Sequence, residues 1–208
     1  MIDGINPVDK DSIASLKEAY KTIAGRIDLE ARSAAAFELL SKPAAGTQDE
    51  PDMCLRLWVT SKTDDAVRLL ESLLIAENLN DDQRRRVWLL IERTEGLEPE
   101  FFARVLPNVV GRDDCPRCVS EILECENQIS ATAATEHQRY SLGQGIVKAF
   151  RMSSSQEAKN RLAAWLKRLN VEGVLKELEN YGQMSDDDIA VLDSHFGKSK
   201  QWRKVKQK

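Results

Sequence analysis

The sequence predicts an all-α protein, built either as an array of stacked antiparallel helical hairpins or as an irregular helical bundle. Apolar residues recur at alternating spacings of three and four along much of the chain, as Ile13, Leu16 and Tyr20 illustrate. This spacing places the side chains on one face of a helix. Strand signals are scarce, because no strict run of alternating apolar and polar residues lies between turns.

Four segments are expected along the 208 residues. Residues 1–42 read as an N-terminal helical segment, in which Asp9 or Asp11 could cap a helix through Ile27 or beyond. Residues 43–52 are rich in proline and small residues and indicate a linker or long loop. The helical-hairpin domain is expected over 53–197, and a basic tail over 198–208.

The middle of the chain has the most regular helical pattern. An apolar stripe over Ala66–Leu74 predicts one helix, and the N-cap signal Asn80-Asp81-Asp82 precedes another. The third begins at Pro99, which a first helical turn tolerates, although Pro107 should kink or shorten it. Asp113-Asp114 is expected to cap a fourth helix.

The C-terminal third predicts further helices over 136–150, 156–169, 171–181 and Ile189–Phe196. Gly143 and Gly145 weaken the helical pattern of the first. Ser154 or Ser155 could cap the second, and Ser185 with Asp188 resembles a capping box before the last.

The middle helices also indicate an internal repeat. The trio Leu69, Leu70, Leu73 recurs 36 residues later as Val105, Leu106, Val109, and the trio Val87, Leu90, Ile91 recurs 32 residues later as Val119, Ile122, Leu123. Each unit would be a pair of helices, which is typical of a HEAT-like array. Ordinary amphipathic pairs in a bundle would share the same spacing, so both arrangements stay open.

Charge and hydropathy predict where in the cell the protein is located. We find no apolar run long enough to span a bilayer and no signal-peptide pattern, so we expect a cytoplasmic protein with reduced thiols and no membrane contact. The net charge is −4, and removing the six cations of the tail leaves a body of −10. The basic run Arg84-Arg85-Arg86 is expected on a solvated face, paired with Asp81 and Asp82.

Three clustered cysteines are the sharpest candidates for chemistry. Cys115 and Cys118 form a Cys-Pro-Arg-Cys motif, and Cys125 follows seven residues later. The motif resembles the Cys-Pro-x-Cys of glutaredoxins over four residues, but the strand that should precede it is missing. Two thiols at this spacing also suit zinc, yet a second pair is absent, and Cys54, His137 and His195 are distant. Core packing is favoured, with zinc or thiol chemistry as alternatives.

The tail is the candidate for nucleic-acid binding. Its cations could bind phosphates, while Trp202 could stack on an exposed base. The candidate residues are Lys198, Lys200, Trp202, Arg203, Lys204, Lys206 and Lys208.

A protein-interaction or scaffold role without intrinsic catalysis is the function that these patterns favour. We find no glycine-rich phosphate loop, no dinucleotide fingerprint and no catalytic arrangement. Stacked helical pairs present long surfaces for a protein partner, so we expect such a partner and no cofactor. Nucleic-acid association through the tail and a zinc-binding or thiol-dependent role are the alternatives.

Overall fold

The computed structural model describes Ala36 and residues 64–198, apart from residues 93, 95, 113 and 182. Every regular element within these residues is a helix, which confirms the all-α prediction. The elements are α4 (Asp64–Ile75), α5 (Asp81–Glu92), α6 (Pro99–Val110), α7 (Pro116–Glu124), α8 (Glu126–Thr132), α9 (Glu136–Met152), α10 (Gln156–Leu169), the 3-10 helix η1 (Val174–Tyr181) and α11 (Asp186–Phe196).

The predicted N-terminal segment, linker and tail lie almost entirely outside the described residues. Within the first segment only Ala36 is described, and it is helical and buried. Lys198 is the last described residue of the chain. None of the described helices is both long and apolar enough to cross a membrane.

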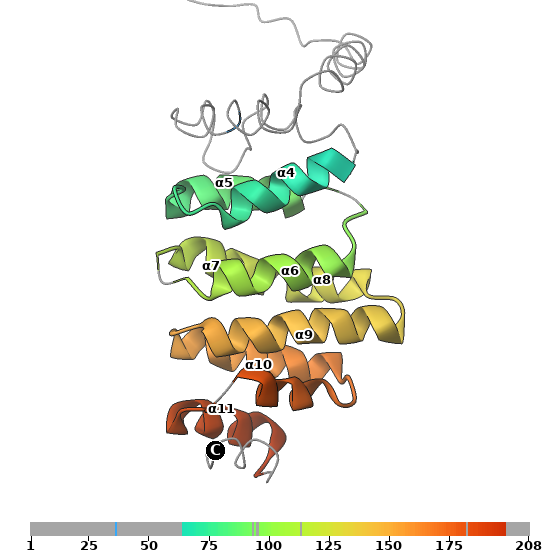
Figure 1. The fold of residues 1–208 in the computed structure, drawn as a ribbon, viewed down its shortest axis with the longest axis vertical. Helices are drawn as coiled ribbons and strands as arrows, with labels where there is room; N and C mark the ends of the chain where they lie inside the picture. Colours follow the sequence, from blue (N-terminus) through green and yellow to red (C-terminus); the bar gives the residue numbers. More distant parts are fainter. Residues whose placement is uncertain are drawn as a thin grey trace, which may run out of the picture.

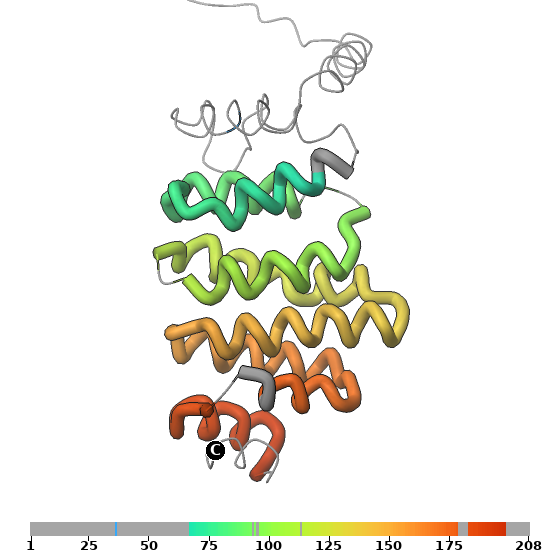
Figure 2. The backbone as a smooth tube through the Cα atoms, in the orientation of Figure 1, coloured from blue at the N-terminus to red at the C-terminus, as the bar shows by residue number. Residues whose placement is uncertain are grey.

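Successive helix pairs stack along the long axis of the molecule (Figures 1 and 2). The first helices of the pairs contact one another, α4 with α6 and α6 with α9. The second helices do the same, α5 with α7 and α7 with α10, and α11 then packs on α10. The helix pairs therefore lie in the order that hairpin stacking requires, while their origin as copies of one repeating unit stays a prediction.

One continuous core runs through the stack and contains the positions on which the repeat prediction rests. The buried trios are Leu69, Leu70 and Leu73 of α4, Val87, Leu90 and Ile91 of α5, Val105, Leu106 and Val109 of α6, and Val119, Ile122 and Leu123 of α7. In α9, Ile146, Val147 and Phe150 have the spacing of the α4 and α6 trios, and each is 0% exposed.

Most of the predicted helix starts are confirmed. The Ser155 hydroxyl accepts from the Ala158 N–H, and Ser185 forms a capping box with Asp188. The expected cap at Asp113-Asp114 is wrong, because α7 starts after Cys115, and Asp114 pairs with Arg112 at 2.7 Å. Pro107 does not shorten α6, which continues to Val110.

The expectation of a solvated face for the Arg84-Arg85-Arg86 run is wrong at its first residue. Arg84 is 0% exposed, and its guanidinium donates to backbone carbonyls at the end of α4 and in the following turn. Arg85 pairs with Glu121 of α7. The sequence pattern misses this because the carbonyls become a binding site for a cation only after α4 and α5 fold against each other.

Candidate functional site

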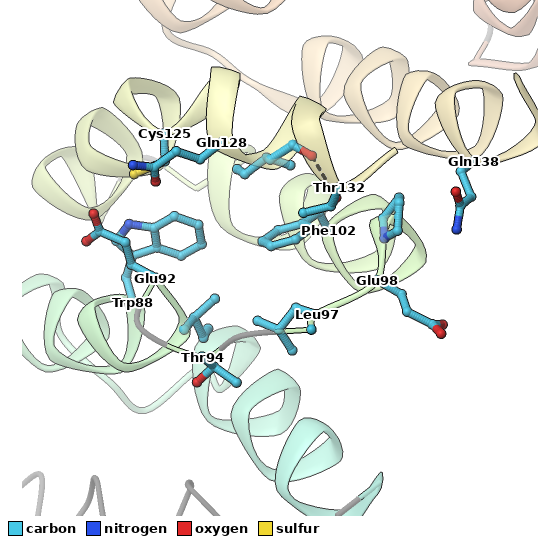
Figure 3. A pocket seen from close by; sticks show the side chains of 14 residues that line it. Trp88, Glu92, Thr94, Leu97, Glu98, Phe102, Cys125, Gln128, Thr132 and Gln138 are labelled. Atoms are coloured by element: carbon cyan, nitrogen blue, oxygen red, sulfur yellow. Dashed lines mark hydrogen bonds between the residues drawn. The ribbon is translucent and has the colours of Figure 1, made fainter. Parts of the chain in front are cut away.

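An apolar cleft of about 400 Å³ opens between α5, α6 and α8, and we call it the Trp88 cleft (Figure 3). The second half of α5 and the loop that follows it form one side, and α8 forms the facing side. Its lining residues are Trp88, Ile91, Glu92, Thr94, Gly96, Leu97, Glu98, Pro99, Phe102, Cys125, Gln128, Ile129, Thr132 and Gln138.

Aromatic rings form the inner wall of the Trp88 cleft. Trp88 is 1% exposed and meets Phe102 edge to face, with 6.5 Å between ring centroids. Phe101 contacts Phe102 in the same geometry at 5.3 Å. Edge-to-face contact is one of the two arrangements that aromatic pairs prefer, so the rings of the wall pack favourably on one another.

The loop between α5 and α6 shapes the lower edge. The Thr94 hydroxyl donates to the Leu90 carbonyl at 2.7 Å and satisfies one of the carbonyls that the end of α5 leaves without a helical partner. Gly96 then adopts a left-handed conformation with φ of +80°, which favours glycine. This turn places Leu97 in the core, and Pro99 starts α6.

The short helix α8 forms the facing wall and was not predicted from the sequence. The helix has seven residues, of which Ile129 alone is buried, so no helical apolar stripe is visible in the sequence. It follows α7 after a break at Cys125, whose N–H donates to carbonyls of α7 at 3.2 Å. Thr132 donates to the Ile129 carbonyl, which leaves its hydroxyl satisfied within the helix.

The buried Trp88 indole N–H has no oxygen or nitrogen acceptor within hydrogen-bond distance among the described residues, and it interacts with the Cys125 thiol. Figure 3 shows the nitrogen edge of this ring turned toward Cys125 and Gln128. A thiol is a weak acceptor, so this interaction is weaker than a hydrogen bond to oxygen. Burial and the Glu92 charge raise the pKa of the Cys125 thiol to about 11, while the Trp88 N–H opposes the rise. An occupant with a carbonyl or carboxylate oxygen would satisfy the donor.

The rim of the Trp88 cleft is acidic. Glu92 and Glu98 are both exposed and lie at opposite ends of it in Figure 3. Its lining residues include no lysine, arginine or histidine. An apolar interior with a negative rim suits an apolar group that is flanked by positive charge.

Cys115 and Cys118, the strongest candidates from the sequence, lie in the core. Both thiols are free and 0% exposed, and burial raises the pKa of each. They are therefore protonated at neutral pH, which makes them poor nucleophiles. In the described part of the chain no group of three or more His, Cys, Asp or Glu side chains is placed to hold a metal. Metal analysis of the purified protein is the direct test of the zinc alternative.

The cluster of three cysteines is divided in space. Cys125 is partly buried and lines the Trp88 cleft, whereas Cys115 and Cys118 face the interior. Of the predicted nucleic-acid-binding residues, Lys198 is exposed, and the others lie outside the described residues.

Comparison with known protein families, with curated proteins and with solved structures finds no match to this chain. The geometry of the Trp88 cleft is therefore the basis for a functional assignment. Its side chains offer an apolar surface, one buried donor and two carboxylates, which is a combination suited to binding.

Proposed function

We propose that this protein is a helical interaction module or scaffold without catalysis of its own, and that the Trp88 cleft holds an apolar side chain of a protein partner. The packed aromatic wall under an acidic rim is the observation that supports this role most directly. Well-packed aromatic pockets at the centre of an interface are where binding energy concentrates.

The partner would present an apolar anchor with positive charge beside it. The anchor would pack against Phe102 and Leu97, while its flanking cations would approach Glu92 and Glu98. A backbone carbonyl of the partner would offer the Trp88 N–H an oxygen acceptor in place of the Cys125 thiol. A hydrogen bond to oxygen is the stronger of the two, because a thiol is a weak acceptor.

Stacking of the helix pairs as a HEAT-like array belongs to the same proposal. The contacts of α4 with α6 and of α6 with α9, together with those of α5 with α7 and of α7 with α10, would let further pairs extend the surface along which a partner lies.

Nucleic-acid association through the tail is the second candidate. Residues 198–208 contain six cations, one tryptophan and no acidic residue, which favours contact with phosphates and exposed bases. The body of the chain, at −10 without the tail, would oppose close approach of a polyanion.

The test uses two variants of α8 in the full chain. Gln128→Trp places a large side chain at the mouth of the Trp88 cleft, and Asn127→Trp places the same side chain on the exposed neighbour outside it. A partner captured by the wild type and by Asn127→Trp, but lost with Gln128→Trp, would support the proposal. Equal capture by all three proteins would place the contact elsewhere.

A further inference from the structure

We propose that the Trp88 cleft of one copy of this chain receives Met152 of a second copy, so that the copies join head to tail. The inference rests on the proposed binding role of the same cleft and names the partner as the chain itself. Met152 is the last residue of α9, whereas the cleft lies beside the start of that helix.

Met152 has the chemistry of an anchor for the Trp88 cleft. Among the described residues it is the one large hydrophobic side chain that is exposed, at 47%. Single exposed apolar side chains are common on protein surfaces, so the match to the cleft, rather than the exposure, supports the inference. A methionine fills irregular apolar gaps, and its sulfur makes favourable contacts with aromatic rings. Trp88 and Phe102 provide such rings at the inner wall of the cleft.

A cation lies beside Met152, as the acidic rim of the cleft requires. Lys148 is one helical turn before Met152 on the same face of α9. It is exposed and pairs with no acidic side chain among the described residues. When Met152 enters the cleft of a second copy, Lys148 would approach Glu92 or Glu98 of that copy.

The other charges around this anchor are already engaged or lie farther from it. Arg112, at the adjoining end of α6, is ion-paired. Glu100 and Glu177 line a groove with Lys148, and Glu177 accepts from Gln144, one turn nearer the start of α9. Lys148 is therefore the cation beside the anchor that can meet carboxylates of a second copy.

One molecule cannot place Met152 in its own cleft. Fourteen positions of α9, at about 1.5 Å each, put Met152 about 21 Å along the helix from Gln138, which lines the cleft. A methionine side chain is much shorter than this distance. Because the anchor and the cleft are different surfaces, each joined copy still offers one of the two, and association continues into open chains or closes into a ring.

Sedimentation velocity of the full chain tests the contact. Raising the protein concentration should produce species larger than a dimer. Met152→Ala should weaken this self-association at least about tenfold, since a few central side chains dominate most interfaces. Met152→Leu keeps a large apolar anchor and should stay close to the wild type. A chain that is monomeric at every concentration, or that associates equally well as Met152→Ala, would overturn the proposal.

The charge match has its own pair of variants. Lys148→Gln should weaken self-association roughly two- to fivefold and reduce its dependence on salt, as expected for an exposed ion pair. Lys167→Gln is the matched control, because Lys167 is exposed on α10 and outside both surfaces. Equal weakening by the two variants would overturn the assigned contact, since net charge alone would then explain it.

Mixing two variants tests the head-to-tail arrangement. Gln128→Trp fills the mouth of the cleft and should abolish self-association, as loss of the anchor does. A mixture of Gln128→Trp with Met152→Ala should form a heterodimer, because the first keeps the anchor and the second keeps the cleft. A mixture that stays monomeric would overturn the proposal.

The same variants separate this inference from the proposed function. If the chain stays monomeric while Gln128→Trp abolishes capture of a different protein, the cleft binds that protein and self-association through Met152 is wrong. If Gln128→Trp changes neither self-association nor capture, both proposals are wrong.

Discussion

Arg84 is a charged side chain that the fold buries completely for a structural purpose. Its guanidinium donates to the carbonyls of Leu74, Ala76 and Leu79, the last two at 2.8 Å and 3.0 Å. The carbonyl end of a helix has partial negative charge, which favours a cation there. Arg84 therefore closes the turn between α4 and α5.

Replacing Arg84 with methionine should lower the free energy of unfolding by about 3 kcal/mol, because buried carbonyls lose their donors. Urea unfolding measures the change. Arg117→Met is the control, since Arg117 pairs with Asp82 at the surface, where an ion pair contributes about 0–1 kcal/mol. A comparable loss in both variants would show that Arg84 has no special role.

The Cys115 thiol gives the protein a pH dependence in the alkaline range. Burial raises its pKa from an ordinary 9.0 to about 11. Above about pH 9 the unfolded chain releases this proton while the folded chain keeps it, so ionisation favours the unfolded state. The stability is fully present below pH 9 and is lost as the pH rises through 11.

Denaturant unfolding from about pH 8 to about pH 11 should show this loss, with a contribution of up to about 3 kcal/mol from Cys115. Cys115→Ala removes one of the three thiols whose pKa is raised, so the loss of stability over that range should become smaller by the share of Cys115. An unchanged slope in the alanine variant would assign the pH dependence to other groups.

Gly145 shows why α9 contains a residue that weakens helices. A Cβ atom at this position would lie 2.4 Å from the Cα and 2.6 Å from the carbonyl oxygen of Ala103 in α6. The two helices therefore approach as closely as a glycine allows. Gly145 therefore lowers the helical propensity of α9. It also permits the close contact between α9 and α6.

Gly145→Ala should reduce stability by about 2 kcal/mol, because the overlap with the α6 backbone exceeds the gain in helix propensity. Gly143→Ala is the matched control on the same helix. Its Cβ would meet the Val174 side chain at 2.7 Å, and a side chain can move more readily than backbone. Thermal unfolding of both variants tests this, and a smaller loss for Gly145→Ala would contradict it.

Within the described residues, α11 is the last helix of the stack, and an ion-paired carboxylate attaches it to α9 and α10. Asp188 is 7% exposed and accepts from Lys159 at 2.6 Å and from Arg151 at 3.1 Å. These two partners lie on α10 and α9. In a stack whose units contact mainly their neighbours, damage at one end should remain local.

Asp188→Asn should free α11 from the stack, with a cost of about 3 kcal/mol for leaving buried cations without their carboxylate. Hydrogen exchange should accelerate in α11 and stay unchanged in α4 and α5. An equal acceleration in all helices would mean that the molecule unfolds as one unit.

Most helices, and several of the residues at which they begin, could be predicted from the sequence. The start of α10 at Ser155 and the capping box at Ser185 depend on residues within four positions of each other. Such local interactions can be predicted from neighbouring residues in the sequence. The short α8 was missed because its single buried residue leaves no periodic pattern.

By itself the sequence determined the all-α class, the apolar stripes and the burial expected of Cys118, since each depends on helical spacing within one element. Only the tertiary structure determined which carbonyls accept from Arg84. It also determined that Trp88, Phe102 and Gln128 line one cleft. These last three residues come from three helices, and only the packing of those helices brings them together. Long-range packing is therefore the physical reason that the candidate site was absent from the sequence analysis.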